Sequence, residues 1–167
     1  MKWSNNPSKR GRYAEWCVEK ILRDKGFQII ARYKGRSLSN EPSDVVFFDL
    51  ILGCIYLAEV KTRKHFGPRP GTVNVSQIRK LLDSCLKMAP LVVLPLVIMR
   101  GRHTNWYFYP YDNWKRWKKD YTFLQRDGIP LTQLFPGDKV YSRYESWNLF
   151  LKELPSGNLY PRWPDYS

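Results

Sequence analysis

The stretch that decides the fold is Cys54-Ile55-Tyr56-Leu57-Ala58-Glu59-Val60-Lys61, an apolar run that ends on two charged residues. Such a run, rich in β-favouring residue types, predicts a buried strand. A second run of the same kind covers 44–50, and Gly53 stands between the two where a turn is needed. We therefore expect two neighbouring strands that pair as a hairpin.

Three charged residues lie at one end of this hairpin. Alternate side chains of a strand share a face, so Glu59 and Lys61 point the same way. The hairpin would bring Asp44, which opens the first run, beside them. Two carboxylates and a lysine at the end of a sheet suit divalent-metal-assisted hydrolysis of a phosphodiester. The plainer alternatives are a surface ion pair worth under ~1 kcal/mol and an aspartate that ends a loop.

The other elements predict an α/β fold, a mixed central β-sheet flanked by helices. Helical spacing of apolar residues predicts helices over 13–25 and 76–88, with Gly26 ending the first and Ser76 capping the second. Strands are predicted over 27–32, 91–99 and 105–109, and loops over 33–43 and 62–74. We expect three parts: a flexible basic arm over 1–12, a core over 13–110 and an aromatic-rich C-terminal extension over 111–167, with helices over 112–121 and 144–154.

The composition favours a polyanionic partner. The formal net charge is +13, and residues 1–110 hold 19 Lys and Arg against 8 Asp and Glu. A membrane surface is a weaker alternative, since no basic amphipathic helix with a broad apolar face is evident. The chain begins without an apolar signal region, and its longest apolar stretch, 91–99, is too short to cross a bilayer. Three cysteines without a Cys-x-x-Cys spacing suit a reducing cytoplasm.

The ordered set of motifs resembles the PD-(D/E)XK nuclease superfamily. It is most similar to the archaeal-type Holliday junction resolvases, which also occur in some viruses. The resemblance covers roughly residues 8–110 and departs from the family at Pro42-Ser43-Asp44, where a serine separates the proline from the acidic residue. The phrases that carry it are Gly11-Arg12-Tyr13-Ala14-Glu15, Leu22-Arg23-Asp24-Lys25-Gly26-Phe27, Asp44, Glu59-Val60-Lys61 and Gln77.

The resemblance implies a restriction-endonuclease-like core and a catalytic set. Asp44 and Glu59 would bind Mg²⁺, for which Mn²⁺ would substitute, and Glu15 would complete the acidic cluster directly or through water. Lys61 would orient the attacking water or neutralise charge in the transition state. Either Ser37 or Ser39 would contact the scissile strand.

The implied activity is hydrolysis of four-way DNA junctions by paired symmetrical nicks, carried out by a homodimer in the cytoplasm, or in the host cytoplasm for a viral member. No small-molecule substrate is expected. Two alternatives stay open: a related nuclease for flaps, forks, ends or duplex DNA, and a non-catalytic nucleic-acid-binding module. The expected nucleic-acid contacts are Lys9, Arg10, Arg12, Arg32, Lys34, Arg36, Ser37, Ser39, Arg63, Lys64 and Gln77.

The aromatic residues after 110 have two readings. Trp114 and Trp117 stand among Lys115, Arg116, Lys118 and Lys119, which is compatible with base stacking beside cations. Packing in a core or dimer interface is the commoner use of tryptophan, and we favour it here.

Overall fold

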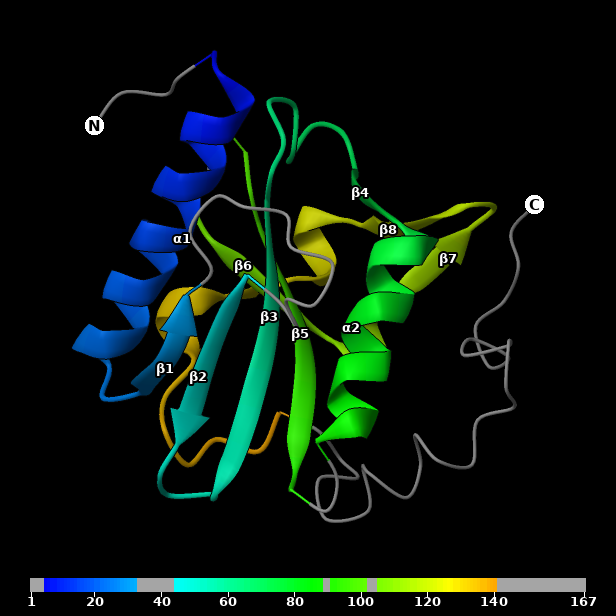
Figure 1. Cartoon of the computed structure of the whole chain (residues 1–167). Helices are drawn as coiled ribbons and strands as arrows, with labels where there is room; N and C mark the ends of the chain where they lie inside the picture. The colour runs from blue at the N-terminus through cyan, green and yellow to red at the C-terminus, as the bar shows by residue number, and fades with distance from the viewer. Residues whose placement is uncertain (1–4, 33–43, 89–90, 102–104, 141–167) are drawn as a thin grey trace.

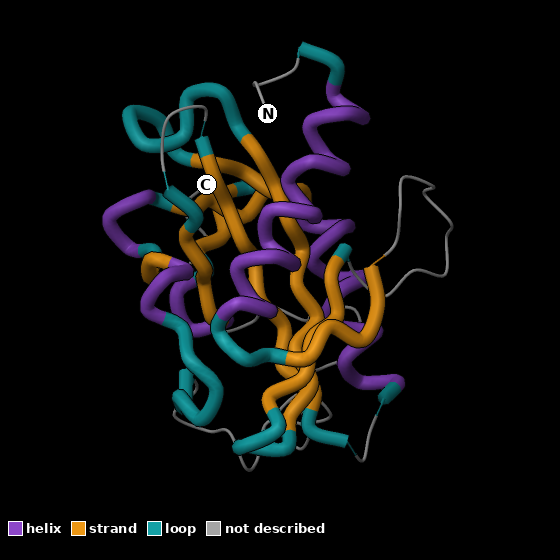
Figure 2. The backbone as a smooth tube through the Cα atoms, turned by 90° about the vertical axis from the view of Figure 1, so that its left-hand side faces the viewer, coloured by secondary structure: helices purple, strands orange, loops and turns teal. Residues whose placement is uncertain are grey.

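A computed structural model describes residues 5–32, 44–88, 91–101 and 105–140, and its largest element is a six-stranded mixed sheet. Helix α1 (Pro7–Asp24) packs on strands β1 (Gln28–Arg32) and β3 (Cys54–Thr62). Helix α2 (Val75–Lys87) packs on β5 (Val93–Arg100) and on β3 (Figure 1). Figure 2, the view from the α1 side, shows the strands running through the middle of the molecule with the helices against them. The sheet has the order β1 (Gln28–Arg32), β2 (Val45–Asp49), β3 (Cys54–Thr62), β5 (Val93–Arg100), β6 (Tyr107–Pro110) and β9 (Ile129–Pro130).

The expected hairpin forms the centre of this sheet. Strands β2 and β3 are antiparallel, and Val45 lies opposite Ala58. On its other edge β3 runs parallel to β5 for eight residue pairs, ending with Thr62 beside Arg100. Gly53 closes the turn at φ 69°, a left-handed conformation that favours glycine. The apolar runs thus predicted both strands correctly, and they place the charged end of β3 beside a buried parallel neighbour.

A buried aspartate fixes the β2–β3 turn. Asp49 is fully buried, and its Oδ1 accepts hydrogen bonds from the backbone N–H groups of Ile51 at 2.9 Å and Leu52 at 3.0 Å. Its Oδ2 accepts a third bond from Gly137 N at 2.8 Å, which ties the segment after β9 to the turn. Three donors satisfy this carboxylate, and satisfied bonds are what a buried charge requires.

The first helix begins earlier than the apolar pattern predicts. Helix α1 spans Pro7–Asp24, so the expected flexible arm is wrong for residues 7–12. Asn6 caps the helix, since its Oδ1 accepts from Ser8 N at 3.0 Å and Lys9 N at 3.3 Å, and Pro7 suits the first helical position. At the other end Gly26 follows the C-cap at φ 98°, as expected. The basic residues of 7–12 therefore lie in the first two turns of a helix.

Replacing Asn6 by alanine is expected to destabilise the protein by about 1 kcal/mol, because two N–H groups of the first turn lose their acceptor. Urea denaturation followed by circular dichroism measures this change. Asn6→Ser keeps a capping oxygen and should recover most of the loss. Equal losses in both variants would contradict the capping role.

The second helix and the segment before it correct two expectations. Helix α2 spans Val75–Lys87, and its cap is Asn74, whose Oδ1 accepts from Ser76 N at 2.8 Å. Ser76 is therefore not the cap. The expected loop over 62–74 ends in strand β4 (Gly71–Asn74), which pairs with β8 (Asp120–Phe123). A strand of four residues whose partner lies far along the chain leaves little local signal.

The expected helix over 112–121 is wrong. The chain forms a 3-10 turn (Tyr111–Asn113) followed by the hairpin of β7 (Lys115–Trp117) and β8, and the small sheet has the order β4-β8-β7. Trp114 is fully buried, which confirms packing as its role. The side chain of Trp117 and the expected helix over 144–154 lie outside what the structure describes. Neither helix among the described residues is both long and apolar enough to cross a membrane.

Candidate active site

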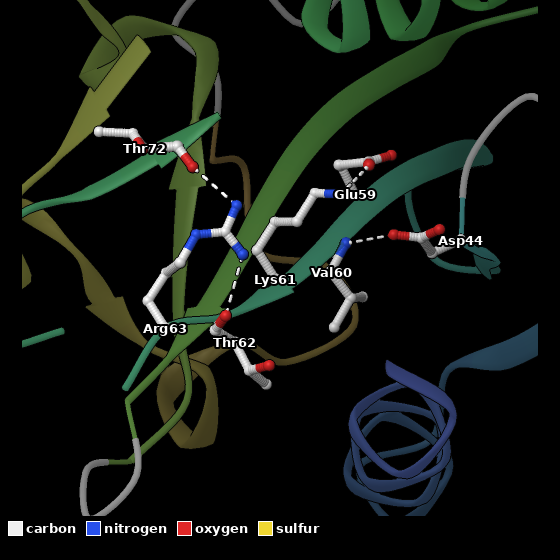
Figure 3. A network of polar contacts seen from close by, with 7 residues as sticks. All are labelled: Asp44, Glu59, Val60, Lys61, Thr62, Arg63 and Thr72. Atoms are coloured by element: carbon white, nitrogen blue, oxygen red, sulfur yellow. Dashed lines mark hydrogen bonds and ion pairs between the residues drawn. The ribbon is translucent and has the colours of Figure 1, made fainter. Parts of the chain in front are cut away.

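Asp44 is held against the middle of β3 by its own backbone and side chain. Its N–H donates to Ala58 O at 3.1 Å, and its Oδ2 accepts from Val60 N at 2.8 Å (Figure 3). The Oδ2 bond fixes the orientation of the Asp44 carboxylate relative to β3. The hairpin therefore brings Asp44 beside the Glu59-Val60-Lys61 segment, as the sequence predicts.

Glu59 and Lys61 form an ion pair on one face of β3. Lys61 Nζ lies 2.9 Å from Glu59 Oε1, and Figure 3 shows both side chains on the side of the strand away from Val60. The Lys61 side chain is only 18% exposed and the Glu59 side chain only 13%. An exposed surface pair would be more solvated, and two charges withdrawn from water need each other or a further partner. This geometry disfavours the reading as a plain surface pair.

Glu15 lies on α1 and is partly buried. In the part of the chain that the structure describes, no three His, Cys, Asp or Glu side chains are grouped so that they could hold a metal ion. Glu15, Asp44 and Glu59 therefore do not form one three-ligand group. Two carboxylates are compatible with Mg²⁺, which commonly keeps several water ligands and binds one or two protein carboxylates. Of these three residues, Asp44 and Glu59 are brought together by the hairpin, since Asp44 bonds to Val60, the residue next to Glu59.

The Arg63 guanidinium donates hydrogen bonds to backbone carbonyl groups. Its Nη1 donates to Thr62 O at 2.9 Å and its Nη2 to Thr72 O at 3.0 Å, and its own N–H donates to Arg100 O at 2.9 Å. Burial lowers the pKa of its guanidinium; nearby Arg10 lowers it further, and Glu59 acts in the opposite direction. Arg63 thus links the end of β3 to β4, a positioning role that the sequence did not indicate.

The remaining expected nucleic-acid contacts divide into four sets. Lys9, Arg12, Lys64 and Gln77 have exposed side chains, on α1, after β3 and on α2. Arg10 is partly buried near Arg63. Arg32 ends β1, opposite Val45, but its side chain is outside the described set. Lys34, Arg36, Ser37 and Ser39 all lie outside the described residues.

Arg100, which ends β5, was not among the site residues that the sequence predicted. Its guanidinium carbon lies 5.4 Å from the centre of the Trp106 ring, within cation–π range. It also interacts with the Tyr13 hydroxyl, whose pKa is raised by a hydrogen bond with Cys17 and by burial while Arg100 lowers it. Arg100 therefore adds a cation near Arg63, at the end of the two parallel strands. An arginine directly after a buried strand is the signal that was available in the sequence.

Comparison with solved structures identifies the fold. The chain superposes on Archaeoglobus fulgidus Hjc, a Holliday junction resolvase from an archaeal hyperthermophile, with a TM-score of 0.60 and 20% sequence identity. The fold is the restriction-endonuclease-like fold of Hjc. The match covers 72% of this chain and 96% of Hjc. Neither a protein-family model nor a curated protein matches the sequence.

The superposition bears on the fold alone. The expected α/β architecture, a mixed central sheet flanked by helices, is confirmed. Almost all of Hjc has a counterpart here, whereas more than a quarter of this chain lies outside the match. The common scaffold contains the mixed sheet, in which β3 carries Glu59 and Lys61 and Asp44 directly precedes β2.

Proposed function

We propose that this protein is a metal-dependent, structure-selective DNA endonuclease, and that its substrate is the four-way junction. The observation that carries the proposal is the position of Asp44 beside the partly buried Glu59–Lys61 pair on a resolvase-like sheet. A basic chain of net charge +13 suits a polyanionic substrate. The order of motifs from Gly11 to Gln77 adds support, since it resembles the archaeal-type resolvases.

Mg²⁺ would be held by Asp44 and Glu59, and by Glu15 through a water molecule. Hard carboxylate oxygens are the ligands that Mg²⁺ prefers. When bound, the ion supplies Lewis-acid stabilisation of the phosphate and a water of lowered pKa. Mn²⁺ is expected to substitute. These ligand roles rest on the position of Asp44 beside Val60, next to Glu59, and on the resemblance.

Residues of the chain hold the Asp44 carboxylate, the Lys61 ammonium and the end of β3 in place. The Val60 N–H bond fixes one oxygen of Asp44, so the other has a defined direction. Lys61 is held by Glu59 within reach of the same face of β3. There its ammonium would orient the attacking water or neutralise charge that develops on the phosphate oxygens. Arg63 keeps the end of β3 fixed against β4, which limits motion of the catalytic strand.

Two-fold symmetry of the substrate suggests how the protein assembles. An open four-way junction has a two-fold axis, and a C₂ homodimer would present two active sites to opposing strands. We propose paired symmetrical nicks by such a dimer. The three cysteines are free thiols, which suits action in the reducing cytoplasm.

Cleavage rates on different DNA structures test the assignment. Purified protein with Mg²⁺ is expected to cut a labelled immobile junction at least ~10-fold faster than a flap, a fork or a linear duplex of the same strands, a discrimination that needs only about 1.4 kcal/mol. Equal rates on all substrates would retain the nuclease and remove the junction preference. Tight, salt-sensitive binding without any cutting would favour a non-catalytic module.

A further inference from the structure

The β7–β8 hairpin and the neighbouring face of α2 carry a second group of cations, apart from the candidate active site. Lys118 and Lys119 form the hairpin turn and are exposed, and Arg116 on β7 is partly exposed. Arg79 and Lys80 are exposed on α2. We call these five side chains the hairpin patch.

The hairpin is anchored in the core. Trp114, directly before β7, is fully buried, and its Nε1 donates to Tyr109 O at 2.7 Å. Tyr121 and Phe123 on β8 are also buried, and the Trp114 ring lies 6.0 Å from Tyr121 and 6.4 Å from Phe123 between centroids. A ligand that binds the tip therefore meets a backbone that is already ordered, which lowers the entropic cost of binding.

The turn itself does not require a lysine. Lys118 has φ 53° and is the one non-glycine residue with positive φ among those that the structure describes. Glycine takes this conformation without strain and asparagine takes it readily, whereas a residue such as lysine is strained there. What lysine adds at this position is a positive charge on an exposed residue of the hairpin turn.

The hairpin tip is attached to the start of α2. Lys119 O accepts a hydrogen bond from Val75 N at 3.0 Å. Arg79 is four residues after Val75 and so lies one turn further along the same face of the helix. Among the residues that the structure describes, the acidic residues on the same elements are Asp83 on α2 and Asp120 on β8, both partly buried. Five cations therefore stand against two carboxylates. Lys115 is excluded from the patch because it pairs with Asp127 at 3.1 Å.

The hairpin patch is held in a fixed relation to Glu59 and Lys61. Arg63 Nη2 donates to Thr72 O on β4, and β4 pairs with β8 along its whole length. Figure 1 shows the hairpin on the α2 side of β3 and α1 on the other side. The α1 cations Lys9 and Arg12 and the hairpin patch thus flank the candidate site from two sides.

We propose that the hairpin patch binds the phosphate backbone of a duplex arm of the DNA that is cut at the Asp44–Glu59 site. The inference rests on the proposed function and extends it to a second contact region. Fixed cations on a rigid hairpin and a helix face suit phosphate contacts that position a duplex without reading its sequence.

The test is a charge-neutral variant of the hairpin turn, Lys118→Asn with Lys119→Gln. Asparagine tolerates the φ of position 118, so the hairpin should fold as before. For a junction with arms of about two helical turns, we expect affinity to fall roughly 10-fold and the slope of log K against log [salt] to become shallower by about 2. For a junction with arms of about half a turn, affinity and the single-turnover cleavage rate should not change.

A matched control separates local contacts from overall charge. Lys20→Gln with Lys87→Gln removes the same charge from α1 and from the far end of α2. This control should bind the long-armed junction like the wild type. Equal losses in both variants, or no loss in the hairpin variant of a protein that binds and cuts junctions, would overturn the inference and keep the proposed function. A wild type that binds no DNA would overturn both.

Discussion

Replacing Asp44 by asparagine, or Glu59 by glutamine, is expected to lower junction cleavage by at least ~10³-fold, because a carboxylate that holds Mg²⁺ contributes several kcal/mol to the barrier. Asparagine at 44 keeps an oxygen that can accept the Val60 N–H bond, so the hairpin should stay intact. Junction affinity should be kept or rise, since each variant removes a negative charge near the phosphates. Single-turnover cleavage and a gel-shift titration measure the two effects.

The matched control for these variants is Asp24→Asn. Asp24 ends α1 and is exposed, and its replacement removes the same charge outside the candidate site. Its cleavage rate should equal that of the wild type. Undiminished cleavage by both site variants would remove Asp44 and Glu59 from the chemistry and would contradict the proposed site.

Replacing Trp114 by alanine is expected to destabilise the protein by about 3–5 kcal/mol, the usual cost of emptying a large buried aromatic site. The indole also donates to Tyr109 O, and its loss would leave that buried carbonyl without this donor. Because the ring packs on Tyr121 and Phe123, the β7–β8 hairpin should loosen first. Urea denaturation gives the free energy, and amide exchange in 115–123 reports on the hairpin.

Trp16→Ala is the control for the loss of a tryptophan. Trp16 is 46% exposed on α1, where it stacks on Tyr13, and its removal should cost less than about 1 kcal/mol. A Trp114 variant as stable as this control would contradict a packing role for Trp114 and would favour the alternative of base stacking.

The sequence predicted the centre of the fold because its signals there are local. The run from Cys54 to Ala58 and its partner before Gly53 are apolar and continuous, and a buried central hairpin needs that pattern. The position of Asp44 beside Val60 followed from the hairpin alone. The Glu59–Lys61 pair followed from the alternation of side chains.

The parts that were not predicted depend on distant partners or on short signals. Strand β4 forms because Gly71 and its neighbours pair with Phe123 and the rest of β8. No residue pattern within 71–74 predicts a strand. The start of α1 depends on one cap, Asn6-Pro7, inside a polar stretch that resembles a loop. The tail alternates tryptophan with cations at a spacing that suits a helix, yet the burial of Trp114 against β8 selects the hairpin.

The roles of Arg63 and Asp49 also depend on partners that are distant in the sequence. Both are charged residues whose partners are backbone groups: Thr72 O for Arg63 and Gly137 N for Asp49. Sequence position suggested a phosphate contact for Arg63 and gave no role to Asp49. Only the paired strands and the packed turn show that each one joins separate segments of the chain.

Mapping the cuts on a four-way junction tests the central claim most directly. Each of the four strands of an immobile junction is labelled in turn and incubated with the protein in Mg²⁺ or in EDTA. The account predicts Mg²⁺-dependent nicks at symmetrical positions in two opposing strands, and none in EDTA. Cleavage that continues in EDTA, or its absence in both Mg²⁺ and Mn²⁺, would contradict a metal-dependent nuclease built on Asp44, Glu59 and Lys61.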